Sequence, residues 1–187
     1  YNRTPNTPIN SRIVEAFSQT NGSDLNSAGD KMMNSIALDY NGDGYEQPVI
    51  MYQRELAGNQ YLWFSFPDID QASLGINSID LNPSQGLMQV DANNPSPIIK
   101  SAKGDFNDDG KEELVVVYAY QNQLTVALLH PTPFNQGARY NVLATLVIDS
   151  FHPLNNNDHQ SFDVAVGDYD DNGTPDIAVA AFEPDAN

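Results

Sequence analysis

Three nine-residue segments of the chain carry oxygen-bearing side chains at the same relative positions. Each has aspartate first, asparagine or aspartate third and fifth, and glycine sixth; the segments are residues 39–47, 105–113 and 168–176. A hard cation such as Ca²⁺ binds six to eight oxygen atoms, and the carbonyl of the seventh residue and water molecules would complete such a set. Glycine at the sixth position permits the sharp turn that folds a loop around an ion. The pattern therefore predicts three cation-binding loops.

The acidity of the chain is concentrated in these segments. They hold 12 of the 25 acidic residues, whereas the 187-residue chain has only 8 lysines and arginines. Carboxylates held a few ångströms apart repel one another unless a cation lies between them. Three Ca²⁺ ions would change the formal net charge from −17 to −11. A surface this acidic repels phosphate groups, which argues against binding to nucleic acid or to anionic membranes.

Two other structures produce similar motifs. Asp-Gly and Asn-Gly are common in plain hairpin turns that bind no ion. Three copies in the same phase, with first aspartates 66 and 63 residues apart, favour a structural repeat instead. An EF-hand needs a carboxylate at the twelfth position and flanking helices. That position holds Ile50, Val116 and Val179 within apolar, β-branched sequence, so the EF-hand is rejected.

No motif for catalysis accompanies the loops. Cysteine is absent, which excludes disulfides, zinc–thiolate sites and thiol nucleophiles. The sequence lacks a nucleophile elbow, a P-loop, a dinucleotide fingerprint and a zinc-protease motif, and it has no apolar run of about 18 residues that could span a membrane. His130, His152 and His159 share no metal-ligand spacing, so we expect ordinary loop histidines. We expect a binding role without catalysis of its own.

The second and third segments, read with the residues around them, resemble FG-GAP/VCBS repeats. The resemblance lies in the glycine before the first aspartate, the loop itself and the apolar strand that follows it. In that family the loop joins the first two strands of a blade in an integrin-α-like β-propeller and binds Ca²⁺. The ligands that the resemblance implies, with carbonyl oxygens at the seventh position, are Asp39, Asn41, Asp43 and Tyr45; Asp105, Asn107, Asp109, Lys111 and Glu113; and Asp168, Asp170, Asn172, Thr174 and Asp176.

The first segment departs from the family pattern at two positions. Gln47 replaces the carboxylate at position nine, and Leu38 replaces the glycine before the first aspartate. The amide oxygen of Gln47 can still bind an ion, but the site carries less negative charge. We therefore expect up to three Ca²⁺ ions, with the weakest affinity in the first loop.

The sequence between the loops predicts further β-strands. Strands are expected on both sides of each loop and also at 61–66, 124–129 and 140–148. Apart from a short helical turn around residues 11–17, we find no 3.6-residue periodicity. Four strands in about 64 residues is the size of a propeller blade.

We therefore predict an all-β fold of about three four-stranded propeller blades. The approximate boundaries are 35–97, 98–160 and a partial blade at 161–187, after a lead-in or outer strand of a preceding blade at 1–34. Propellers usually close with four to eight blades, and open blade faces and strand edges promote aggregation. We expect the remainder of a longer chain, or other copies of this chain, to complete the propeller.

The resemblance implies an extracellular binding or adhesion module for a carbohydrate or protein ligand, with structural calcium. Weak Ca²⁺ sites fill only at the calcium concentrations found outside cells, which predicts a secreted or cell-surface location. Two alternatives stay open. One is an accessory or scaffold propeller of a secreted polysaccharide-active enzyme, and the other is a structural subunit of an extracellular assembly.

Overall fold

The computed structural model describes most of the chain from residue 31 to residue 182. The described ranges are 31–56, 58–65, 68–69, 76–77, 89–90, 99–120, 123–131, 140–148 and 162–182. Every regular element within them is a β-strand, and all strand pairs are antiparallel, which confirms the all-β prediction. These residues contain no helix long and apolar enough to cross a membrane. The helical turn expected around residues 11–17 lies outside the described residues.

The strands form two four-stranded sheets, a two-stranded sheet and one separate pair of very short strands. The first sheet contains β1 (Lys31–Leu38), β2 (Gln47–Leu56), β3 (Asn59–Ser65) and β6 (Gln89–Val90), in that order. The second sheet contains β7 (Ile99–Gly104), β8 (Glu113–Tyr120), β9 (Gln123–Pro131) and β10 (Tyr140–Ile148), also in chain order. The third sheet contains β11 (Phe162–Gly167) and β12 (Asp176–Ala181), and the small pair is β4 (Asp68–Ile69) with β5 (Ile76–Asn77). The strands expected at 61–66, 124–129 and 140–148 are present as β3, β9 and β10.

The second sheet lies at the centre of the stack, and its two faces contribute to two separate cores. Alternate residues of a strand point to opposite faces. Leu114 and Val116 of β8 pack in one core with residues of the first sheet, among them Met51. Val115 and Val117 lie in the other core with residues of the third sheet. This explains why β8 is an unbroken apolar run, since all four side chains are fully buried.

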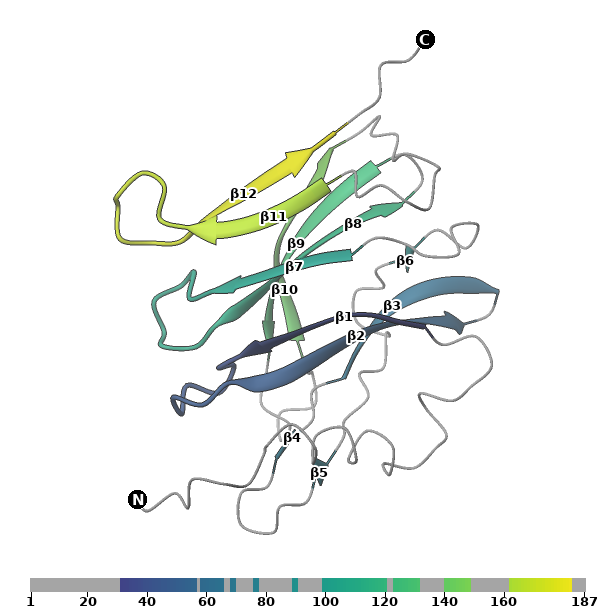
Figure 1. Cartoon of the computed structure of the whole chain (residues 1–187), viewed down its shortest axis with the longest axis horizontal. Coiled ribbons are helices and arrows are strands. Elements are labelled where there is room, and N and C mark those ends of the chain that lie inside the picture. Colours follow the sequence, from purple (N-terminus) through teal and green to yellow (C-terminus); the bar gives the residue numbers. More distant parts are fainter. Residues whose placement is uncertain are drawn as a thin grey trace.

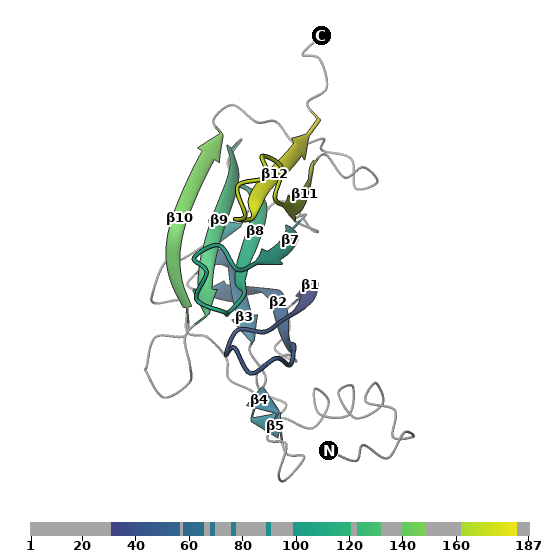
Figure 2. The ribbon, with the colours of Figure 1, turned by 90° about the vertical axis from the view of Figure 1, so that its left-hand side faces the viewer.

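The stacking of the sheets brings the three candidate loops to one side of the molecule. Strand β7 lies against both β1 and β11, so the first strands of the three sheets are neighbours. In Figure 1 the loops that follow β1, β7 and β11 project from the same side, and Figure 2 looks onto that side. Each loop therefore joins the first two strands of its sheet and lies next to the loop of the neighbouring sheet.

The described strands do not close into a ring, and the outer strand of the central sheet is exposed. Every residue of β10 from Asn141 to Ile148 is exposed. Leu146 is 60% exposed, whereas Val126, its pairing partner in β9, is buried. Figure 2 shows β10 at the outer edge of the second sheet. The central sheet thus has a buried inner part and an uncovered apolar outer edge.

Substitution at the centre of the stack should cost far more stability than the same change at its edge. Leu114→Ala should lower the free energy of unfolding by about 2–5 kcal/mol, because the truncation leaves a cavity between two sheets. Leu146→Ala, a matched change on the same sheet, should alter it by less than about 0.5 kcal/mol. Urea denaturation at a fixed calcium concentration measures both. Similar losses for the two variants would contradict the central position of β8.

Candidate metal-binding loops

The three candidate loops share a hydrogen-bond pattern that is centred on their first aspartate. One carboxylate oxygen accepts the N–H of the fifth residue, and the other accepts the N–H of the sixth. In the third loop, Asn172 N lies 3.0 Å from Asp168 Oδ1 and Gly173 N lies 2.9 Å from Asp168 Oδ2. The corresponding distances are 3.2 and 2.9 Å in the second loop and 3.1 and 2.8 Å in the first. The sequence repeat is therefore also a repeat of local structure.

The third and fifth residues add two more bonds to each turn. The third side chain accepts the N–H of the fifth residue, and the fifth side chain accepts the N–H of the seventh. The acceptors are Asn41 and Asp43, Asn107 and Asp109, and Asp170 and Asn172; the seventh residues are Tyr45, Lys111 and Thr174. These bonds gather the oxygen atoms of the first, third and fifth side chains around one turn.

Two backbone positions of each loop are left-handed. The sixth residue is always glycine, with φ of +82°, +82° and +89° at Gly44, Gly110 and Gly173. The fourth residue is left-handed as well, with φ of +74°, +57° and +59° at Gly42, Asp108 and Asp171. Aspartate adopts this conformation more readily than most residues with a side chain. The turn at the sixth position is confirmed, whereas the sequence pattern alone did not reveal the fourth.

Strand register brings the ninth residue of each loop back to the base of that loop. Gln47, Glu113 and Asp176 each pair with the residue that precedes the first aspartate. Two of these side chains also accept the N–H of the second residue in their loop. Phe106 N lies 2.8 Å from Glu113 Oε2, and Tyr169 N lies 3.0 Å from Asp176 Oδ2. The ninth carboxylate thus lies beside those of the turn.

The third loop brings three carboxylates together. Oxygen atoms of Asp168, Asp170 and Asp176 lie within 4.8 Å of one another. In the part of the chain that the structure describes, no lysine, arginine or histidine forms an ion pair with any of them. The possible metal ligands are all oxygen atoms, which Ca²⁺ prefers as ligands. The residues of this loop therefore fit a hard divalent cation.

A residue from outside the second loop contacts it, and the sequence interpretation missed this residue. Glu113 is fully buried, and His130 Nδ1 lies 2.6 Å from its Oε1. Asn107 Nδ2 donates to the same oxygen at 3.0 Å. Ligand atoms of Asp109, Glu113 and His130 lie within 4.8 Å of one another. His130 belongs to β9, so the expectation of an ordinary loop histidine is wrong.

The first loop contains a buried amide oxygen that lacks a donor. Gln47 is only 8% exposed, and its Nε2 donates to Asp43 Oδ1 at 3.4 Å. Its Oε1 has no hydrogen-bond partner among the described residues. A buried polar atom without a partner destabilises the fold by about 1–3 kcal/mol, and a cation would supply the missing partner. The first loop therefore also fits a cation, although it has fewer carboxylates.

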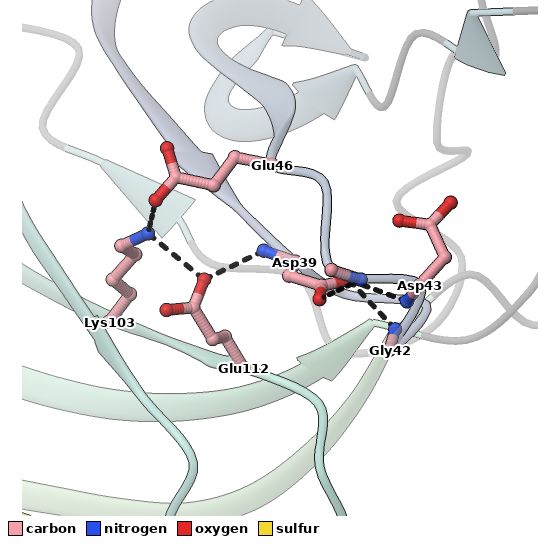
Figure 3. A network of polar contacts seen from close by, with 7 residues as sticks. Asp39, Gly42, Asp43, Glu46, Lys103 and Glu112 are labelled. Atoms are coloured by element: carbon pink, nitrogen blue, oxygen red, sulfur yellow. Dashed lines mark hydrogen bonds and ion pairs between the residues drawn. The ribbon is translucent and has the colours of Figure 1, made fainter. Parts of the chain in front are cut away.

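An ion-pair network lies between the first and second loops. Lys103 Nζ lies 3.0 Å from Glu112 Oε2 and also forms an ion pair with Glu46 (Figure 3). Burial alone would lower the pKa of Lys103, but hydrogen bonds to Glu46 and Glu112 and their negative charges raise it above its usual value. Lys103 is therefore held in its charged form, with Glu46 and Glu112 as its ion-pair partners.

Comparisons with protein-family models, with curated proteins and with solved structures found no match to this chain. The resemblance to FG-GAP/VCBS repeats consequently rests on the three motifs and the strands around them. The chemistry of the loops is defined by their oxygen donors, their negative charge and a backbone that is shaped alike in all three.

Replacing the sixth glycine should weaken a loop through its backbone conformation. Gly110→Ala should lower the free energy of unfolding by about 1–2 kcal/mol, because residues with a Cβ adopt its φ of +82° poorly. No atom lies within 4 Å of the added Cβ, so the effect is not steric. Gly167→Ala is the matched control, since that glycine is not left-handed and the nearest atom is 3.5 Å away. Chemical denaturation in chelator measures both, and a larger loss for Gly167→Ala would contradict the assignment.

Proposed function

We propose that this chain is a Ca²⁺-binding segment of a β-propeller of the FG-GAP/VCBS type, in which the ions have a structural role. The observation that carries the proposal is the group formed by Asp168, Asp170 and Asp176. Their oxygen atoms lie within 4.8 Å of one another, and none has a basic partner among the described residues. Like charges this close favour a bound cation. The first and second loops have the same backbone and would bind in the same way.

In this proposal the ions stabilise hairpins whose own charges oppose folding. A cation that binds only the folded chain adds RT ln(1 + [Ca²⁺]/Kd) to the free energy of unfolding. With a Kd of ~0.1 mM and ~1 mM free Ca²⁺, each site contributes about 1.4 kcal/mol. Three sites contribute about 4 kcal/mol, a large part of the stability of an ordinary domain. Calcium at this level is found outside cells, and we propose a secreted or cell-surface location on that ground.

The arrangement of the sheets supports the proposal of propeller blades. The second sheet has four strands in chain order, and its first strand lies beside the first strands of both neighbouring sheets. The loops that join first and second strands lie on one side of the stack (Figure 1). A module of this kind acts by presenting its surface, and we propose a carbohydrate or protein ligand for it.

The exposed outer edge supports the proposal that further strands complete the structure. Strand β10 is exposed along residues 141–148, and it carries Leu143 and Leu146 with exposures of 48% and 60%. Apolar edge strands pair readily with other strands. We propose that the remainder of a longer chain, or other copies of this one, covers this edge. If other copies cover the edge, the protein would be a structural subunit of an extracellular assembly.

Calcium should raise the melting temperature of the chain by about 10 °C when it replaces a chelator in the buffer, because three sites add about 4 kcal/mol. Asp176→Asn removes one carboxylate of the third loop and should reduce this shift by about one third. Asp163→Asn makes the same charge change on the same sheet outside the loop, and should leave the shift unchanged. Calorimetric scans with and without calcium measure all three proteins. An identical melting temperature in calcium and in chelator would refute the structural role of the ion.

The edge of β10 should mediate association of the isolated 187-residue chain. Sedimentation velocity in calcium should detect species heavier than 20.5 kDa, and their fraction should increase with protein concentration. Leu146→Lys should shift the distribution towards monomer, because a charge on an edge strand blocks pairing. Phe182→Lys is the matched control, since Phe182 is 63% exposed but follows β12 of the third sheet, outside the loops. Monomer at every concentration, or an equal effect of both variants, would contradict association through this edge.

A further inference from the structure

The first and second loops are joined by a reciprocal pair of hydrogen bonds. Glu112 N donates to the carbonyl oxygen of Asp39 at 2.9 Å, and Asp39 N donates to Glu112 Oε2 at 2.7 Å. Figure 3 shows the Glu112 carboxylate reaching both Asp39 and Lys103. Asp39 is the aspartate around which the first loop is organised, whereas Glu112 is the eighth residue of the second loop. The position of each loop therefore depends on the other.

A single peptide group connects the second cation site to Asp39. The carbonyl of this peptide belongs to Lys111, the seventh-position ligand implied for the second loop, and its N–H belongs to Glu112. The peptide is trans, and a peptide group is planar and conjugated. A cation bound at this carbonyl would withdraw electron density and would make the N–H a stronger donor. Filling the second loop would thus strengthen the bond that holds Asp39.

The first loop depends on this support more than the others do. The carboxylate of Asp39 accepts N–H bonds from Gly42, Asp43 and Gly44, so a shift of Asp39 displaces the whole turn. Gly42 also packs closely on the second loop, because an added Cβ would lie 3.3 Å from the carbonyl oxygen of Gly110. Gln47 is 8% exposed, and its Oε1 has no hydrogen-bond partner among the described residues, which independently points to a cation in the first loop.

The third loop lacks this connection. Its eighth residue is Pro175, which has no N–H and no carboxylate. Pro175 lies close to the second sheet, since a Cβ at Gly104 would be 3.3 Å from its side chain. The hydrogen bonds of the described residues nevertheless include none between Pro175 and Asp105, the counterpart of Asp39. The chain therefore contains one linked pair of loops and one unlinked loop with the same backbone.

We propose that Glu112 is a positioning residue that couples divalent-cation binding in the first and second loops, while the third loop binds independently. This rests on the calcium proposal above. Coupling between two sites is reciprocal, so filling either loop raises the affinity of the other by the same factor. The bond between Glu112 and Asp39 is the physical connection, and it involves neither of the side chains that would hold the ions.

Titration calorimetry with CaCl₂ on the full chain measures the coupling factor. Asp39→Ala, Asp105→Ala and Asp168→Ala each disable one loop, so pairs of these changes leave a single loop active. The association constants of loop one and of loop two are each measured in a variant in which only that loop is active. Their product is compared with the overall constant for binding two ions to Asp168→Ala, in which both loops are active. We expect the overall constant to exceed the product about 5- to 10-fold. The same comparison for loops two and three should give a factor near one.

Substitutions at the eighth position separate coupling from folding. Glu112→Pro imitates the third loop and should bring the factor near one while both loops still bind. Glu112→Ala removes the side-chain bond to Asp39 and the ion pair with Lys103 but keeps the N–H, and it should lower the factor in part. Glu112→Gln keeps the N–H and an acceptor oxygen and should retain the factor. Pro175→Ala is the control and should leave the factor for loops one and two unchanged, because it alters only the third loop.

A factor near one in the unsubstituted loops, or an unchanged factor in Glu112→Pro, overturns the coupling while the calcium proposal stands. Absence of calcium binding in every protein overturns both.

Discussion

The structure depends on one interaction that occurs three times: an aspartate carboxylate that accepts two backbone N–H groups of the turn that follows it. In all three turns the fourth and sixth residues are left-handed. The sixth is therefore glycine, and the fourth is glycine or aspartate. Folded in this way, the turn places its third and fifth side chains beside the first, and negative charge accumulates as a direct consequence of backbone geometry.

The strands determine what surrounds this charge. The hairpin register returns the ninth residue to the base of the loop, and stacking of the three sheets aligns the loops along one side. The stacking also explains the glycine before the second loop, because a Cβ at Gly104 would lie 3.0 Å from a methyl group of Val166 on the neighbouring sheet. Leu38 has the same place in the first hairpin, where it is fully buried in the core. The same packing that forms the cores thus brings the acidic loops together.

Many features of the loops and strands could be predicted from the sequence, because the patterns that specify them are local. The turn at the sixth glycine, the strands on either side of each loop and the return of the ninth residue follow from motifs a few residues long. The contacts of Glu112 and His130 depend on pairings between strands. Leu114 pairs with Leu129, and this β8–β9 register places Glu113 opposite His130. The sequence alone does not give that register. Contact between Glu112 and Asp39 requires the packing of two sheets, for which the sequence carries no short-range signal. Closure of a propeller requires strands beyond those described.

The three loops share one backbone but differ where they meet their surroundings, and these differences make them unequal. The first loop offers two carboxylates and a buried amide, whereas the second and third each offer three carboxylates. The fully buried Glu113 of the second loop is held by donors from three residues, whereas the third loop is more exposed and its eighth residue is a proline. Charge favours a cation in the second and third loops, and hydrogen bonding between neighbouring sheets supports the first. A repeat that keeps its turn can therefore vary the charge of its candidate sites and their contacts with a neighbouring sheet through the eighth and ninth residues.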